Sequence, residues 1–290
     1  MNKRKLSVKA VTDLASNHLK KSGIGGSTGE ARLLISLATG MSRERIIGYP
    51  ESHLRNSELE KLKKFLKLRC NRKPMSQIVG LREFWSLDFL IDEDVLDPRP
   101  DSETLIEAAL DLFPNRKAKL KILDLGTGSG CLLLSLLKEF QNAVGIGTEI
   151  NTNSCLVAVE NSRRLELSSR ASFIVCDWYK SLEEKFDIIL ANPPYLTDQE
   201  MVNLEPEVFK FEPHRALSGG LDGLDSYKKI IPHVHKFLSE KGILFLEISP
   251  KLSSRIRTIL KESQLRPLVA KRDLSGQLRC FAVRGSDNNF

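Results

Sequence analysis

The most informative stretch of this 290-residue sequence is Leu120-Lys121-Ile122-Leu123-Asp124-Leu125-Gly126-Thr127-Gly128-Ser129-Gly130. Its first half is short and mostly apolar, which predicts a buried strand over residues 120–125. Its second half is a glycine loop of the pattern G-x-G-x-G, and a helical pattern follows over residues 131–140. Glycines let the backbone approach a ligand closely, and N–H groups at a helix start can meet a carboxylate. The stretch therefore predicts a ligand-binding strand, loop and helix.

From residue 119 onward, segments of strand pattern alternate with segments of helix pattern. We expect six further strands, at residues 144–150, 173–176, 186–191, 243–248, 268–269 and 280–284, with helices between them that include 153–165 and 226–238. Such alternation predicts an α/β fold with a seven-stranded, mostly parallel, Rossmann-like sheet and helices on both faces. Ligands of such sheets bind beyond the carboxyl ends of the strands.

Acidic and aromatic residues follow the second and third of these strands. Glu149 ends the strand at 144–150, where a carboxylate can accept hydrogen bonds from both hydroxyls of a ribose. Asp177 and Trp178 follow the third strand. With the glycine loop, these residues describe a site for an adenosine-bearing ligand, in which the loop meets an amino-acid part and Asp177 and Trp178 lie near the adenine. Core packing would explain Trp178 alone equally well.

The strand at 186–191 stops at Asn192-Pro193-Pro194-Tyr195. Proline fixes φ and lacks an N–H, so this strand exit is stiff and cannot continue a ladder of hydrogen bonds. It presents a carboxamide, backbone carbonyls and an aromatic ring, which suit a planar substrate that carries an NH2 group. An ordinary proline-terminated strand end is the alternative interpretation. From this stretch alone, an adenine base and an amide are equally good candidates for the substrate group that carries the NH2.

Charge is distributed unevenly along the chain. Residues 1–80 carry a net charge of +11 and residues 81–290 a net charge of −4. This asymmetry predicts two units, of which the first faces an acidic partner such as nucleic acid or an acidic protein. A solvated, lysine-rich helical surface would explain the same charges.

The sequence predicts three domains or segments: a helical domain over residues 1–75, a linker over 76–98 and an α/β domain over 99–290. In the helical domain, Ser27-Thr28-Gly29-Glu30 fits a capping box and Ser57 could cap a later helix. In the linker, short strands or a hairpin are expected at residues 78–80 and 84–91. At the start of the α/β domain, Arg99 and Glu103 could form an ion pair that shapes the entrance to the site.

Composition excludes several classes of protein. The chain has no apolar run of 18 or more residues, so no membrane span is expected. Its five cysteines show no C-x-x-C spacing, which argues against a zinc site and against a disulfide framework. We therefore expect no metal and a reducing, cytoplasmic location.

Taken together, the motifs resemble a known family. The loop at residues 124–130 and the tetrad at 192–195 look like those of class I S-adenosylmethionine methyltransferases that act on an amino or amide nitrogen. The flanking segments resemble the peptide chain release factor glutamine methyltransferases at residues 78–80, 84, 95–100, 103, 212–213, 216–224 and 273–279. The likeness covers about residues 70–285, and the helical domain, which would recognise the substrate, fits by size and position.

The resemblance implies S-adenosylmethionine as cofactor and a peptide chain release factor as partner. The methyl group would go to the side-chain amide nitrogen of the glutamine in the Gly-Gly-Gln motif of bacterial release factors. The expected cofactor-binding residues are Gly126, Thr127, Gly128, Ser129, Gly130, Glu149, Asp177, Trp178 and Asn192. The expected substrate-binding residues are Asn192, Pro193, Pro194 and Tyr195, of which Asn192, Pro193 and Tyr195 are the expected catalytic residues.

Three other functions remain open at this point. The same tetrad serves adenine-N6 methyltransferases of DNA or RNA, for which the basic first 80 residues would bind phosphates. A non-catalytic, cofactor-dependent binding module is an alternative of another class. A nicotinamide dehydrogenase is disfavoured because the glycine spacing is not G-x-G-x-x-G.

Overall fold

The computed structural model describes residues 6–285, so the ends of the predicted domains at residues 1–5 and 286–290 lie outside the described residues. The chain divides into two compact units. The smaller unit comprises Met1–Gly80 and Pro206–Phe211, and the larger unit comprises Leu81–Glu205 and Glu212–Phe290. Between residues 6 and 285, no helix is both long enough and apolar enough to cross a membrane.

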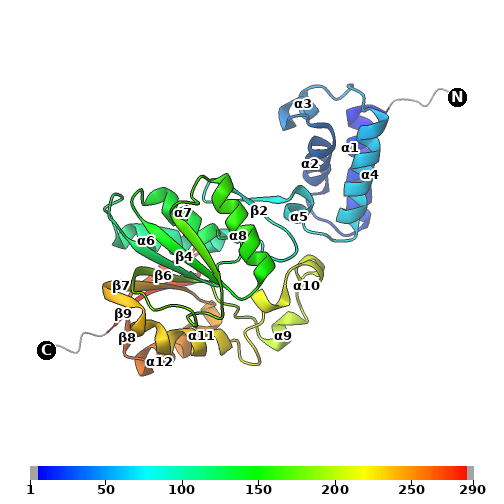
Figure 1. Ribbon diagram of the computed structural model, residues 1–290. Helices are drawn as coiled ribbons and strands as arrows, with labels where there is room; N and C mark the ends of the chain where they lie inside the picture. Colours follow the sequence, from blue (N-terminus) through cyan, green and yellow to red (C-terminus); the bar gives the residue numbers. More distant parts are fainter. Residues whose placement is uncertain (1–5, 286–290) are drawn as a thin grey trace. The chain divides into compact units, whose positions relative to one another are not determined.

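The smaller unit is a helical bundle, as predicted (Figure 1). Its helices are α1 (Val8–Lys21), α2 (Ser27–Thr39), α3 (Arg43–Gly48), α4 (Asn56–Cys70), α5 (Met75–Val79) and α10 (Pro206–Phe211). Apolar side chains at helical spacing form its core, and Leu19, Leu34 and Ile35 are fully buried there. The strand expected at residues 78–80 is wrong, because this segment ends helix α5 and Gly80 closes it with φ +77°.

Both predicted helix caps in this unit are also wrong. Helix α2 begins after Gly26, which has φ +62°, and no side chain caps it. Ser27 instead shares a hydrogen bond with Ser16 over 3.0 Å, so its hydroxyl is directed at a neighbouring helix. Helix α4 begins after Arg55, whose N–H donates to Glu58 Oε2 over 2.7 Å. Helix α2 therefore starts at a left-handed glycine, and helix α4 starts at a local contact between Arg55 and Glu58.

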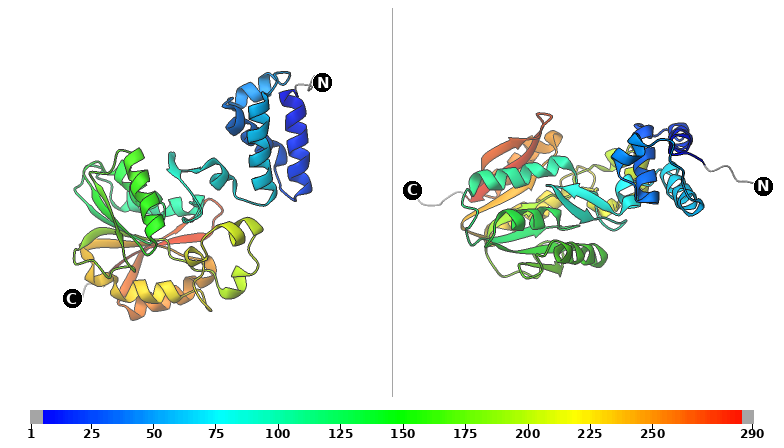
Figure 2. Two further views of the ribbon diagram at one scale, coloured as in Figure 1. Left: turned by 45° about the vertical axis from the view of Figure 1, so that its right-hand side comes forward. Right: turned by 90° about the horizontal axis from the view of Figure 1, so that it is seen from above.

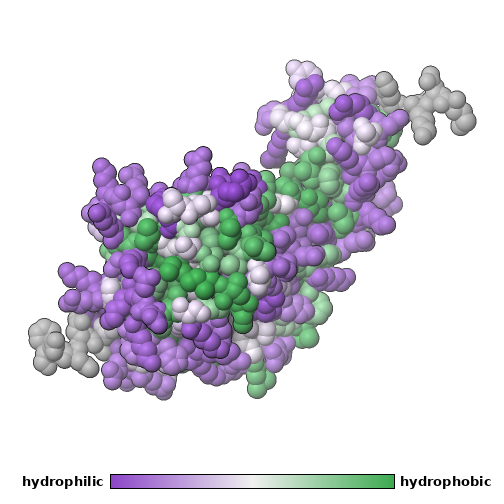
Figure 3. Space-filling view, viewed as in Figure 1, coloured by the Kyte–Doolittle hydropathy of each residue, from purple (hydrophilic) through white to green (hydrophobic). Residues whose placement is uncertain are grey.

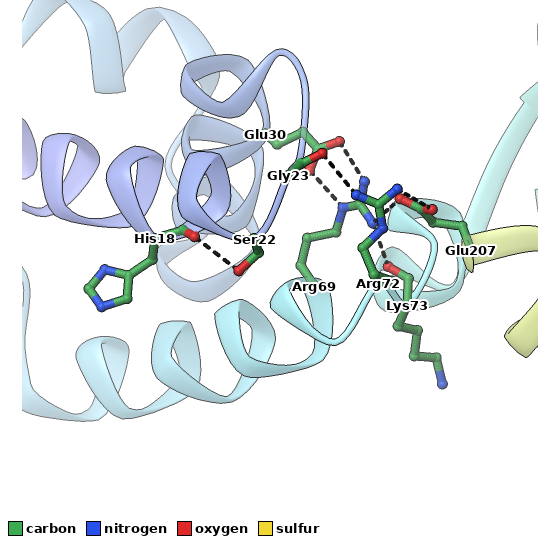
Figure 4. A network of polar contacts seen from close by, with 8 residues as sticks. All are labelled: His18, Ser22, Gly23, Glu30, Arg69, Arg72, Lys73 and Glu207. Carbon is green, nitrogen blue, oxygen red and sulfur yellow. Dashed lines mark hydrogen bonds and ion pairs between the residues drawn. The ribbon is translucent and has the colours of Figure 1, made fainter. Parts of the chain in front are cut away.

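A cluster of ion pairs attaches helix α10 to this bundle (Figure 4). Arg69 Nε lies 2.7 Å from Glu30 Oε2, and its Nη1 lies 3.2 Å from Glu207 Oε1. Arg72 Nη2 lies 2.7 Å from the other oxygen of Glu207. Gln77 Nε2 donates to the carbonyl of Phe211 over 2.8 Å. A segment that follows the Asn192 tetrad in sequence is therefore held by the N-terminal helices.

The larger unit contains the predicted seven-stranded sheet, with strand order β5-β4-β3-β6-β7-β9-β8. Its strands are β3 (Lys121–Leu125), β4 (Val144–Glu149), β5 (Ala171–Val175), β6 (Phe186–Ala191), β7 (Leu238–Glu247), β8 (Leu265–Arg272) and β9 (Leu278–Gly285). The five strands β3 to β7 are parallel, and β9 runs antiparallel to β7 and β8. Strands β4 and β6 flank β3, so the chain changes direction across the sheet at β3. Ligands of parallel sheets bind at such a switch point.

Helices cover both faces of the sheet, and Figures 1 and 2 show these layers from different directions. Helices α6 (Glu103–Leu112), α7 (Cys131–Glu139) and α8 (Thr152–Arg164) lie on one face, and α11 (Asp225–Ile230) and α12 (Ser253–Glu262) lie on the other. The alternation of side chains along each strand separates two cores, so Ile188 and Leu190 belong to one and Ile189 to the other. The helix expected at 226–238 is shorter, because Pro232 lacks an N–H and a 3-10 turn spans Ile231–Lys236.

An antiparallel hairpin, β1 (Leu81–Phe84) and β2 (Leu87–Leu90), precedes the sheet. It confirms the hairpin expected at 84–91. Trp85 and Ser86 form its two-residue turn with φ of +52° and +56°, which matches the twist of tight hairpins. Trp85 Nε1 donates to Glu139 over 2.8 Å, and this bond ties the hairpin to helix α7. Short helices α9 (Asp198–Met201), η1 (Pro100–Ser102), η2 (His214–Ala216) and η4 (Pro250–Leu252) complete the unit.

Candidate active site

A cavity of about 340 Å³ lies in the larger unit at the carboxyl ends of strands β3 to β6. Its size is in the usual range for small-molecule sites. The predicted site residues that line it are Gly126, Gly128, Glu149, Asp177, Trp178, Asn192 and Pro194. The remaining predicted residues lie within two positions of these in sequence but do not line the cavity: Thr127, Ser129, Gly130, Pro193 and Tyr195. Two motifs that are about 60 residues apart therefore share one cavity.

The glycine loop is held against strand β4. The N–H groups of Gly126 and Thr127 both donate to the carbonyl of Thr148 over 2.9 Å. Gly126 has φ +70°, and a Cβ added there would lie 3.2 Å from the Trp178 ring. The absence of a side chain at Gly126 therefore leaves room for this ring beside the loop.

Glu149 links the loop to the start of helix α8. Its Oε2 accepts from the N–H of Gly128 over 3.1 Å, and its Oε1 accepts from the N–H of Asn151 over 3.0 Å. Both carboxylate oxygens are thus oriented by the backbone, and each has a further lone pair. Because Glu149 lines the cavity, those lone pairs are available for ligand hydroxyls.

Behind the loop, Thr127 Oγ1 donates to Asp124 Oδ2 over 2.6 Å. Asp124 is 1% exposed, and burial raises the pKa of its carboxyl to about 7. Gly130 closes the loop with φ +81°, and a Cβ there would lie 3.3 Å from Ala158 Cβ, so its absence brings α7 and α8 together. In this structure Thr127 and Gly130 shape the loop, and their contact with cofactor stays a prediction.

Trp178 follows the turn after β5 and has φ +53°, a conformation that L residues rarely adopt. Its ring packs against the core below the sheet and also lines the cavity. The environment of Trp178 therefore has a part that fits core packing and a part that fits ligand binding, the two interpretations that the sequence allowed. Asp177, beside it, forms an ion pair with Lys180 over 2.7 Å.

Asn192 extends from the end of β6 into the cavity wall. Its Nδ2 donates to Ser102 Oγ over 3.0 Å, and Ser102 Oγ donates to Glu247 Oε2 over 2.6 Å. Burial raises the pKa of the Glu247 carboxyl to about 7. Ser102 and Glu247 are not among the site residues predicted from the sequence. An acid at the end of a buried strand, as at Glu247, was the available signal.

A glycine-containing segment, residues 217–224, supports the backbone of Tyr195. Gly219 N–H donates to the Leu196 carbonyl over 2.8 Å, and Leu196 N–H donates to the Leu217 carbonyl over 2.9 Å. A Cβ at Gly219 would lie 2.8 Å from Tyr195 Cα, and a Cβ at Gly223 would lie 2.6 Å from Tyr195 O. Glycine is therefore required at both positions for this approach. Burial raises the pKa of the Tyr195 phenol to about 12, so the ring is neutral.

The ion pair considered between Arg99 and Glu103 is wrong. Arg99 Nη2 contacts both oxygens of Glu212, over 2.7 and 2.8 Å, and Glu103 Oε1 accepts from the N–H of Trp85 over 2.8 Å. Helix geometry turns Glu103 toward the hairpin. Burial raises the pKa of Glu212, and the adjacent Arg99 opposes this shift. The ion pair between Arg99 and Glu212 thus holds the segment in which the chain returns to the larger unit.

Comparisons with known proteins agree with these motifs. The family model described as Methyltransferase small domain matches residues 101–221, and the PrmC N-terminal domain matches residues 11–80. A release factor glutamine methyltransferase of Rhodospirillum rubrum is 39% identical over 272 residues, covering 94% of this chain and 83% of that protein. One of Caulobacter vibrioides is 35% identical over 269 residues and covers 92% of both chains.

The chain belongs to the release factor glutamine methyltransferase family. Family membership confirms the predicted resemblance and the predicted class of enzyme, a methyltransferase. It disfavours the nicotinamide dehydrogenase and the non-catalytic binding module.

Solved structures of other methyltransferases share the fold of this family. The hMettl16 catalytic domain in complex with an RNA hairpin aligns with a TM-score of 0.55 at 18% identity, over 77% of this chain and 83% of that one. The T. Thermophilus 16S rRNA N2 G1207 methyltransferase aligns with a TM-score of 0.51 at 21% identity, over 71% of this chain and 50% of that one. At these identities the likeness bears on the fold alone, and it confirms the predicted α/β methyltransferase architecture.

Proposed function

We propose that this chain transfers the methyl group of S-adenosylmethionine to the side-chain amide nitrogen of the glutamine in the Gly-Gly-Gln motif of a bacterial peptide chain release factor. One observation carries the proposal: Gly126, Gly128 and Glu149 line the same cavity as Asn192 and Pro194. A donor held by the first group would lie beside an acceptor held by the second. The names of the relatives supply the class of acceptor.

The residues of the cavity fit S-adenosylmethionine. The open side of Gly128 would admit the backbone of an amino acid, and the oriented carboxylate of Glu149 suits the two ribose hydroxyls. The Trp178 ring and Asp177 line the part of the cavity in which the adenine would lie. When bound, this donor supplies an electrophilic methyl group on a sulfonium.

The acceptor residues would position the glutamine amide. An amide nitrogen is a weak nucleophile because its lone pair is delocalised into the carbonyl. The Asn192 Oδ1 and the Pro193 carbonyl would accept hydrogen bonds from the N–H groups of the glutamine amide, and Tyr195 would pack against the amide plane. This arrangement aligns the nitrogen with the methyl group and stabilises the charge that develops on it.

The smaller unit supports a protein acceptor. We infer that its helices recognise the release factor, and the net charge of +11 over residues 1–80 would suit an acidic surface of that partner. A release factor acts in translation, so we place the reaction in the cytoplasm. Nucleic acid could meet the same basic residues, and the experiment below separates the two.

The test follows methyl transfer from labelled S-adenosylmethionine to release factor, DNA and ribosomal RNA in parallel reactions. We expect label on release factor, and its loss when the motif glutamine is replaced by alanine. Asn192→Ala should lower turnover by at least ~100-fold, the usual cost of a lost contact to the reacting group, and keep most of the cofactor affinity. Asn142→Ala, an exposed asparagine, is the matched control. Label only on nucleic acid, or near-normal turnover of Asn192→Ala, would refute the proposal.

A further inference from the structure

Three side chains that are far apart in sequence form one hydrogen-bonded chain at the cavity wall. Asn192 Nδ2 donates to Ser102 Oγ over 3.0 Å, and Ser102 Oγ donates to Glu247 Oε2 over 2.6 Å. Ser102 is 3% exposed and Glu247 is 2% exposed. Because both are shielded from water, their hydrogen-bonding groups depend on each other.

Strand register brings two of these residues together. Strands β6 and β7 are parallel neighbours in which Ala191 is paired with Leu246. The next residues, Asn192 and Glu247, therefore lie side by side at the carboxyl edge of the sheet. Ser102 arrives from the start of helix α6, where it occupies the N-cap position but makes no capping hydrogen bond with its side chain. The Ser102 hydroxyl thus contacts Glu247 and does not cap helix α6.

The order of donors along this chain has a consequence for Asn192. A serine hydroxyl has a single proton, and in Ser102 that proton is directed at the carboxyl of Glu247. While Glu247 is ionised, its carboxylate can only accept, so Ser102 can only accept a hydrogen bond from Asn192. If the carboxamide turned over, Oδ1 would face the Ser102 oxygen with no proton between them. One orientation of the amide is stabilised, and it leaves Oδ1 as the group that Asn192 offers to the cavity.

We propose that Ser102 and Glu247 are positioning residues, which hold the Asn192 carboxamide with Oδ1 toward the acceptor amide. This inference rests on the proposed function and deepens it. The inference requires that substitution of Ser102 or Glu247 lowers turnover, because the orientation of the Asn192 carboxamide matters at the reacting nitrogen. Binding of release factor and of S-adenosylmethionine relies mainly on other residues and should change little.

The kinetic test compares Ser102→Ala and Glu247→Met with a buried control. Ser135 is fully buried in α7, and its hydroxyl has no partner among the residues that the structure describes. Ser135→Ala therefore makes the same chemical change outside the relay, by which we mean the hydrogen-bonded chain of Asn192, Ser102 and Glu247. With release factor as substrate, we expect kcat to fall about tenfold or more in Ser102→Ala and in Glu247→Met, with KM and cofactor affinity within about twofold of wild type. Ser102→Thr, which keeps the hydroxyl, should recover most of kcat. Ser135→Ala should match wild type.

The double variant tests whether Ser102 and Glu247 affect turnover through the same hydrogen-bonded chain to Asn192. Ser102→Ala combined with Glu247→Met should lose no more kcat than either single variant, because each already releases the amide. Multiplied losses would show independent effects and overturn the inference. So would kcat of Ser102→Ala within about twofold of Ser135→Ala, or a loss of cofactor affinity that equals the loss of kcat.

A spectroscopic measurement separates this inference from the proposed function. In protein labelled with 15N-asparagine, the Asn192 NH2 signals are assigned by their loss in Asn192→Ala. We expect Ser102→Ala to move the hydrogen-bonded Nδ2 proton toward the position of solvent-exposed amides, and Ser102→Thr to keep it in place. Unchanged signals in Ser102→Ala would overturn the relay. Absence of methyl transfer to release factor would refute only the proposed function.

Discussion

Gly223 gives a direct test of how tightly the acceptor loop is supported. This residue has φ +74°, and a Cβ added to it would lie 2.6 Å from the Tyr195 carbonyl oxygen and 3.0 Å from Leu252 Cδ1. An ordinary contact begins at 3.4 Å, so Gly223→Ala must move these atoms apart by about 0.8 Å. The nearest of these atoms is the carbonyl oxygen of Tyr195, so the clash acts on the backbone of the tetrad itself.

The size of the effect follows from these distances. The left-handed backbone alone costs an alanine about 1–2 kcal/mol of folding free energy. A displacement near 1 Å at a reacting group lowers turnover by up to about 100-fold. We therefore expect Gly223→Ala to lose at least about 1–2 kcal/mol of folding free energy and about 10- to 100-fold in kcat. Affinity for S-adenosylmethionine should be nearly unchanged, because Gly223 does not line the cavity, whereas Glu149 and the glycine loop do.

A matched control is available in the turn between β8 and β9. Gly276 has φ +77°, and a Cβ there would meet nothing within 4 Å, so Gly276→Ala carries the backbone cost without the clash. The assay compares kcat for methylation of release factor, the melting temperature and the cofactor affinity of both variants. If kcat of Gly223→Ala stays within about threefold of that of Gly276→Ala, close support of the tetrad does not matter for turnover.

Two further predictions concern carboxyl groups near the loop. Glu149→Gln places an NH2 group against either the Gly128 or the Asn151 N–H, so affinity for S-adenosylmethionine should fall about tenfold in calorimetry, and an unchanged Kd would contradict the role of this residue. Asp124 has its folded pKa raised from 3.8 to about 7, so the folded state binds more protons than the unfolded state between these values and loses stability as pH rises through them. Asn cannot titrate, so the stability of Asp124→Asn relative to wild type, measured by urea unfolding, should be higher at pH 8 than at pH 5; the opposite trend would contradict the raised pKa.

Local patterns in the sequence were sufficient for the architecture of the larger unit. Apolar runs that end at glycine, acid or proline predicted β3, β4 and β6 with their loops, because buried parallel strands need apolar side chains on both faces. The hairpin at 84–91 followed from the same kind of reasoning. Predictions that rested on a few local residues were less reliable. Ser27 and Ser57 fit the capping rules, yet α2 starts after Gly26 without a side-chain cap, and α4 starts after Arg55, whose N–H donates to Glu58.

The sequence by itself determined the strand pattern, the glycine loop, Glu149 and the Asn192 tetrad, since each is defined by residues within a few positions of one another. Only the tertiary structure decided the partners of these groups. Strand order places Glu247 beside Asn192, helix α6 delivers Ser102 to both, and Glu207 joins the N-terminal helices through Arg69 and Arg72. These contacts span tens of residues or more, and no local periodicity encodes them, because they depend on how the strands are ordered and on which side chains face inward after packing.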